Sequence, residues 1–147
     1  MIALAQRVAS ARVTVDERVA GAIGQGLLVF VCAEPEDTEA VADKLVDRLL
    51  KMRIFGDASD KMNRSLVDVQ GGLLVVSQFT LAADLSSGQR PSFSGAAPAA
   101  LARRLYERVL VAARERHPIV QAGEFGARMR VELVNDGPVT IPITLRS

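Results

Sequence analysis

The sequence predicts an α+β fold built from layers of mainly antiparallel β-sheet. The sheet is expected to be barrel-like, with two helices packed on one face, so that the layers follow the order β/β/α. Three observations support this prediction. Strand-like and helix-like segments follow one another as strands, helix, strands, helix and strands. Two unbroken apolar runs, at 27–33 and 73–76, are typical of strands covered on both faces. Two other segments, near 38–52 and 98–116, repeat apolar residues along one helical stripe.

The first half of the chain is predicted to form strands and then one helix. A first strand is expected at 2–9, and residues 11–15 either continue it or restart it after a kink; further strands are expected at 19–23 and 27–33. Glu34-Pro35 ends the last of these strands, and a helix begins near Asp37 or Thr38. Acidic residues at the start of this helix and basic residues at its end suit the helix dipole. Residues 56–60 are predicted to form a solvated turn.

The second half is predicted to place further strands on either side of a second helix. The strands are expected at 65–69, 73–80, 119–124, 128–134 and 139–145. Residues 82–97 are rich in Ser, Gly and Ala, and a loop of this length inside a compact domain is typically functional or disordered. The helix runs from Pro98 to Arg116 and ends at a solvent-exposed His117. Residues 135–138, Asn-Asp-Gly-Pro, are expected to form a turn between the last two strands.

Length and composition limit what the chain can be. At 147 residues it is expected to be a single domain, spanning 1–147. A net charge of +1 and an aromatic content of 4% argue against a broad grip on a phosphate backbone, and DNA is not expected as a partner. No apolar run has the length of a membrane span, and no membrane partner is expected. The N-terminus does not resemble a signal peptide and the single cysteine cannot form an internal disulfide, so we expect a cytoplasmic protein.

The usual catalytic constellations are missing from the sequence. It has no Ser-His-Asp elbow motif, no phosphate loop, no dinucleotide fingerprint and no cluster of metal ligands, so neither a metal nor a cofactor is expected. Cys32 is interpreted as a small buried residue rather than a nucleophile. Ser77, Gln78 and Thr80, however, stand at the end of an apolar strand, where backbone N–H groups can stabilise an oxyanion. Such donors suffice for a substrate that is already reactive, such as an activated ester.

Two motifs carry a resemblance that covers the whole chain. They are Ser77-Gln78-Phe79-Thr80 and Asn135-Asp136-Gly137-Pro138-Val139-Thr140. Supporting matches are the opening IALAQRV, Lys61-Met62-Asn63, Arg90-Pro91-Ser92-Phe93 and the segment 123–129. Jointly these motifs resemble those of the D-aminoacyl-tRNA deacylases, the chiral proofreading enzymes of translation.

The resemblance implies a hydrolase that cleaves the ester bond of D-aminoacyl-tRNA, and of mischarged glycyl-tRNA, without a cofactor. It also implies contact with the acceptor end of the tRNA and a homodimer with two sites at the subunit interface. Ser77, Gln78, Phe79 and Thr80 would be the catalytic residues that form the floor of each site. Backbone N–H groups of Phe79 and Thr80 would stabilise the oxyanion, and the ribose 2′-hydroxyl of the tRNA would activate the water.

The other residues carried over from the resemblance would bind the substrate. Gly137 and Pro138, joined by a cis peptide bond, would reach over from the other subunit and exclude the side chain of an L-amino acid. Arg7 matches a position that holds this arrangement, and Phe125 and Met129 fall in the segment that lines the pocket for the terminal adenosine. Two alternatives are a non-catalytic tRNA-binding domain of the same fold and a related trans-editing deacylase of different specificity.

Overall fold

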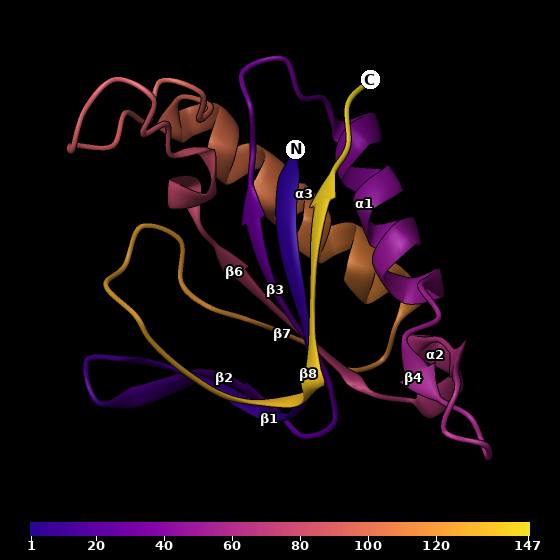
Figure 1. Cartoon of the computed structure of the whole chain (residues 1–147). Coiled ribbons are helices and arrows are strands. Elements are labelled where there is room, and N and C mark those ends of the chain that lie inside the picture. Colours follow the sequence, from indigo (N-terminus) through magenta and orange to yellow (C-terminus); the bar gives the residue numbers. More distant parts are fainter.

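The computed structural model describes residues 1–147 and confirms the α+β fold (Figure 1). Six strands form one sheet in the order β2-β1-β3-β6-β7, and β8 pairs with β1. Their bounds are β1 Ile2–Val15, β2 Arg18–Ile23, β3 Gly26–Cys32, β6 Gly72–Ser77, β7 Val120–Ala122 and β8 Arg130–Thr144. Strand β1 is antiparallel to β2, β3 and β8, whereas β3, β6 and β7 run parallel. A separate antiparallel pair is formed by β4 Phe55–Gly56 and β5 Met62–Arg64.

The two predicted helices are α1 (Glu39–Lys51) and α3 (Ala99–Arg116), which lie together on one side of the sheet (Figure 1). The prediction of a strand at 65–69 is wrong, because Leu66–Val69 forms a third, short helix, α2. Ser65 and Asp68 cap each other's backbone N–H groups there, which favours a helical turn over an extended chain. None of the helices is both long and apolar enough to cross a membrane.

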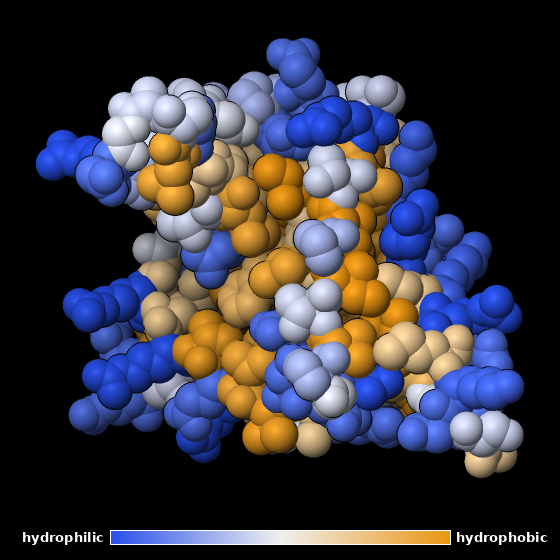
Figure 2. All heavy atoms as spheres, in the orientation of Figure 1, coloured by the Kyte–Doolittle hydropathy of each residue, from blue (hydrophilic) through white to orange (hydrophobic).

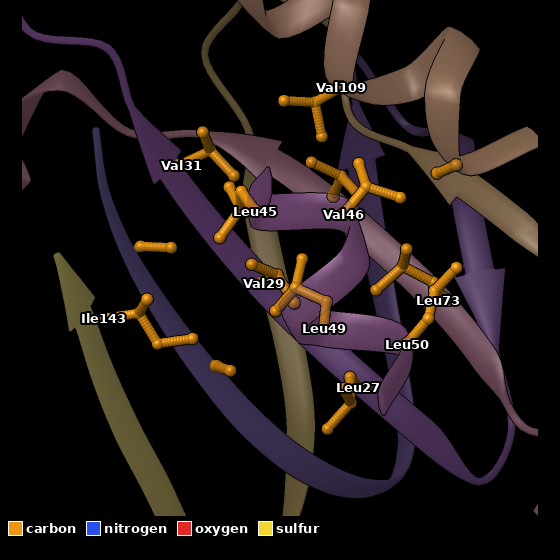
Figure 3. Close-up of a cluster of buried hydrophobic side chains, with 14 of the residues drawn as sticks. Leu27, Val29, Val31, Leu45, Val46, Leu49, Leu50, Leu73, Val109 and Ile143 are labelled. Carbon is orange, nitrogen blue, oxygen red and sulfur yellow. The ribbon is translucent and has the colours of Figure 1, made fainter. Parts of the chain in front are cut away.

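Two hydrophobic cores give the structure its β/β/α layers. In β3, Leu27, Val29 and Val31 face the helices, and Figure 3 shows α1 packing onto them. The intervening Leu28 belongs to a second core between the strands. The same alternation holds in β6, where Leu73 faces the helices. Both strands are therefore buried on their two faces, as their unbroken apolar sequences predict.

The prediction that His117 is exposed is wrong. Its side chain lies at the end of α3 but is buried, and its ring nitrogen Nε2 is 2.6 Å from the carbonyl oxygen of Gly71. Gly71 precedes β6 directly, so the turn before that strand covers the imidazole. His117 therefore joins the end of α3 to the start of β6 and stands apart from the end of β6 at Ser77.

The prediction of two final strands separated by a turn is also wrong, because β8 is a single strand with a bulge. Thr140 pairs with Gln6 and Asn135 pairs with Val8, so residues 136–139 stand opposite Arg7 alone. We call residues 136–139 the β8 bulge. Figure 1 shows that β8 bends sharply along its length. The turn-forming sequence is thus accommodated without ending the strand.

Candidate active site

A pocket of about 560 Å³ opens where β6 ends. The strand predicted at 73–80 stops at Ser77, and Phe79–Ala82 forms a 3₁₀ turn, η1. Five of the predicted site residues line this pocket together: Ser77, Gln78, Phe79, Phe125 and Met129. Most of the other lining residues are hydrophobic. Figure 2 shows hydrophobic side chains gathered across the middle of this face of the molecule.

The change from strand to 3₁₀ turn shapes the floor of the pocket. The backbone N–H of Gln78 still donates to the carbonyl of Val31 at 2.8 Å, which holds this end of the floor on the sheet. Phe79 and Thr80 then begin η1, and the first N–H groups of a helical turn have no partner within the turn. The side-chain amide of Gln78 donates to the hydroxyl of Thr80, which lies beside the pocket and does not line it.

Phe93 lines the pocket, although it was not predicted as a site residue. Its ring meets that of Phe79 edge to face, with centroids 5.0 Å apart and planes at 74°. Backbone hydrogen bonds in both directions between Asp84 and Ser92 close the loop and return the chain to the pocket. The Arg-Pro-Ser-Phe motif was the available signal, because it ends in an aromatic residue within a long polar loop.

Tyr106 on α3 is a second lining residue that was not predicted. Its hydroxyl donates to the carbonyl of Val75 at 3.0 Å and lies 3.4 Å from the carbonyl of Gly123. Val75 lies two residues before Ser77, and Gly123 lies two residues before Phe125. The Tyr106 hydroxyl therefore connects two chain segments that both line the pocket. Burial raises the pKa of Tyr106 to about 12, and the phenol therefore stays a neutral donor at neutral pH.

Cys32 also lines the pocket but offers little nucleophilic character. The residue is buried, and burial followed by the charge of Glu34 raises the pKa of its thiol. The sulfur lies 3.5 Å from the carbonyl oxygen of Ala33 and 3.6 Å from that of Phe79. These contacts fit a protonated thiol, in agreement with the interpretation of Cys32 as a small buried residue. Nowhere in the chain do three His, Cys, Asp or Glu side chains gather as metal ligands.

Arg7 and the β8 bulge form a second cluster of predicted site residues. The Arg7 guanidinium donates to the carbonyl of Asp136 at 3.0 Å and to that of Ile54 at 2.7 Å. The side-chain amide of Asn135 donates to the carbonyl of Arg7 at 2.9 Å and to that of Val139 at 3.0 Å. The bulge is therefore held at its base from both strands.

Position 137, within the β8 bulge, requires glycine. Gly137 has a φ of +138°, and a Cβ there would lie 2.8 Å from the side chain of Val139 and 3.1 Å from Nη2 of Arg7. The Gly137-Pro138 peptide bond is cis, as the resemblance implies. Both residues are exposed, and neither they nor Arg7 line the pocket of their own chain. One chain thus carries the predicted site residues in two separate clusters.

The comparisons with known proteins identify the family of the chain. The family model described as D-Tyr-tRNA(Tyr) deacylase matches residues 4–144. D-aminoacyl-tRNA deacylases from Methylibium petroleiphilum and Azoarcus sp. are 68% and 63% identical, over 99% of this chain and 95% and 96% of theirs.

Two solved structures have a similar fold. The one titled "c-Myc DNA Unwinding Element Binding Protein" superposes with a TM-score of 0.94 at 37% identity over the whole of both chains. A probable eukaryotic D-amino acid tRNA deacylase gives a TM-score of 0.82 at 18% identity over 97% of each chain, which supports the fold alone. The family match and the high identity of relatives over nearly the full length agree, and the chain belongs to the D-aminoacyl-tRNA deacylase family.

Proposed function

We propose that the chain hydrolyses the ester bond of D-aminoacyl-tRNA and of glycyl-tRNA, and leaves L-aminoacyl-tRNA intact. The observation that carries this proposal is the pocket at the end of β6, where the family's Ser-Gln-Phe-Thr motif becomes a 3₁₀ turn with N–H groups at its start. The single unpaired cysteine fits the reducing cytoplasm, and we assign the reaction to that compartment.

Stabilisation of the oxyanion by backbone donors is the main chemical contribution of the protein in this proposal. When water attacks the ester carbonyl, negative charge develops on the carbonyl oxygen. The N–H groups of Phe79 and Thr80 are suited to receive that charge, because they are fixed by η1 and need no reorganisation. Ser77 and Gln78 shape the floor, and the Gln78–Thr80 hydrogen bond holds its conformation.

No side chain in the pocket is suited to act as a general base. Among the residues that line the pocket, only Cys32 and Tyr106 have titratable side chains, and both pKa values are raised. The N-terminal ammonium of Met1 is held by Glu34 at 2.9 Å and by Asp37 at 2.8 Å. This inventory favours activation of the water by the substrate itself, through the 2′-hydroxyl of the terminal ribose, with Phe125 and Met129 holding the terminal adenosine.

Chiral selection is assigned to the β8 bulge of a second copy of the chain. Gly137 and Pro138 are exposed and rigidly supported, and they lie outside the pocket of their own chain. In a homodimer, the bulge of one subunit would cover the pocket of the other. Its backbone carbonyl oxygens would then occupy the space that the side chain of an L-amino acid needs, while a D-amino acid or glycine still fits.

The test is the loss of ester from D-tyrosyl-tRNA, L-tyrosyl-tRNA and glycyl-tRNA in parallel reactions. We expect rapid hydrolysis of the D-tyrosyl and glycyl esters and survival of the L-tyrosyl ester. Binding of tRNA without hydrolysis, even with stoichiometric protein, would favour a non-catalytic tRNA-binding domain. Equal rates with the D- and L-esters would instead favour a deacylase of different specificity.

A further inference from the structure

The guanidinium of Arg103 lies over the ring of Phe125, a residue that lines the pocket. The central carbon of its guanidinium lies 4.6 Å from the centre of the Phe125 ring, a cation–π contact. Phe125 lines the pocket and also contacts Tyr106, with ring centroids 5.8 Å apart. The Arg103 side chain is nonetheless 56% exposed, so its N–H groups face solvent beside the pocket.

The charge of Arg103 is less well neutralised than that of Arg108 and Arg116, two other arginines of α3. Arg108 binds the Asp43 carboxylate through two hydrogen bonds of 2.8 and 3.0 Å. Arg116 donates to Asp47 at 2.8 Å. The carboxylate partner of Arg103 is Glu107, at 4.0 Å, and an exposed pair at that distance contributes little. Arg103 thus keeps donors exposed to solvent and a positive charge that Glu107 offsets only weakly.

We propose that Arg103 binds a backbone phosphate at the 3′ end of the tRNA, the one that joins the terminal adenosine to the nucleotide before it. This inference rests on the proposed function, which brings the terminal adenosine against Phe125. The guanidinium covers the same ring, so Arg103 is placed to receive a phosphate on the 5′ side of that nucleoside. The planar fork of arginine matches the oxygens of a phosphate, and ring stacking pre-orients it. Arg103 is a substrate-binding residue that is specific for the nucleic acid and takes no part in the chemical step.

The experiment compares a substrate that carries this phosphate with a substrate that lacks it. One is D-tyrosyl-tRNA, and the other is the D-tyrosyl ester of adenosine, which has no phosphate. For Arg103→Gln we expect kcat/KM to fall roughly tenfold with the tRNA, the order expected for one hydrogen bond to a charged group. The same variant should hydrolyse the adenosine ester at the wild-type rate. The slope of log(kcat/KM) against log salt concentration should also become shallower by about 0.7 for the tRNA, as for one lost single-strand phosphate contact.

Arg104→Gln is the matched control. It removes the same charge from the adjacent residue of α3, which points about 100° further round the helix and away from Phe125. We expect this variant to keep wild-type rates and salt dependence with both substrates. Arg103→Lys should recover part of the loss, because it restores the charge without the planar fork.

Binding of an RNA hairpin that ends in CCA and carries no amino acid measures the same contact without catalysis. Weaker binding by Arg103→Gln than by Arg104→Gln supports the proposal. Equal binding by the two variants would overturn it. An equal loss of activity on the tRNA and on the adenosine ester would overturn it as well, because Arg103 would then act only through Phe125. Failure of the proposed function has a different signature, since the wild-type protein would then hydrolyse neither substrate.

Discussion

Asn135 is the residue whose loss should loosen the β8 bulge most directly. Its amide donates to carbonyls on both sides of the bulge, those of Arg7 and Val139. Asn135→Ala removes both donors and leaves every residue that lines the pocket in place. We expect the variant to fold and to hydrolyse D-aminoacyl-tRNA, but to reject L-aminoacyl-tRNA less strictly than the wild type.

The cost in stability follows from the two hydrogen bonds. Each one contributes roughly 0.5–1.5 kcal/mol net, so the pair stabilises the folded state by about 1–3 kcal/mol. Asn135 is half-buried, and water can reach part of the space that its amide leaves. We therefore expect the free energy of unfolding to fall by about 1–2 kcal/mol, the lower half of that range.

Chemical denaturation of variant and wild type at one protein concentration measures this loss, because the stability of the proposed homodimer would depend on concentration. Asn63→Ala is the matched control. The amide of Asn63 donates to Asp57 in the exposed β4–β5 hairpin, far along the chain from the bulge, and this variant should remain close to wild type. The reasoning is refuted if Asn135→Ala is as stable as the wild type. It is also refuted if the variant loses stability but keeps the full ratio of D- to L-ester hydrolysis.

Three further variants test other parts of the structure. Tyr106→Phe should cost about 1 kcal/mol in denaturant unfolding, since the carbonyl of Val75 keeps a second donor, the N–H of Gly123 at 3.0 Å. Asp37→Asn should cost about 2–3 kcal/mol in the same measurement, because the buried ammonium of Met1 keeps only one carboxylate; an unchanged midpoint would contradict this. Thr80→Ala should retain substantial deacylase activity, and an acyl group found on the wild-type residue by mass spectrometry would show that Thr80 is a nucleophile.

The parts of the fold that could be predicted from the sequence are those with a regular apolar period. The unbroken run of β3 predicts burial on both faces, and α1 follows from its helical stripe. What could not be predicted depends on partners distant in the chain. His117 at the end of a helix suggests exposure, whereas the folded chain buries it against the turn at Gly71, a contact distant in sequence. The Asn-Asp-Gly-Pro sequence suggests an ordinary turn, and only its register against Arg7 makes it a bulge.

Some errors had a signal that local sequence could have supplied. Ser65 and Asp68 have the spacing of a capping box, which predicts the helix α2 better than a strand. For the site, the family motif identifies Ser77, Gln78 and Phe79, which do share one pocket, whereas Thr80 lies beside it; the roles of these residues remain predictions. Tyr106 lies in an amphipathic helix, and the sequence pattern of that helix predicts only a core position for it. Its second function, a hydroxyl that joins two strand ends, becomes visible only once the sheet is assembled.

The β8 bulge also lies on an open edge of the sheet. Strand β8 pairs only with β1, so its other edge has no partner within the sheet. A long, straight edge of this kind would be a template for adding strands from further chains. The bulge interrupts it midway, and Pro138 and Pro142 have no N–H to donate to an incoming strand. We therefore expect the segment proposed for chiral selection also to disfavour the addition of further strands at this open edge.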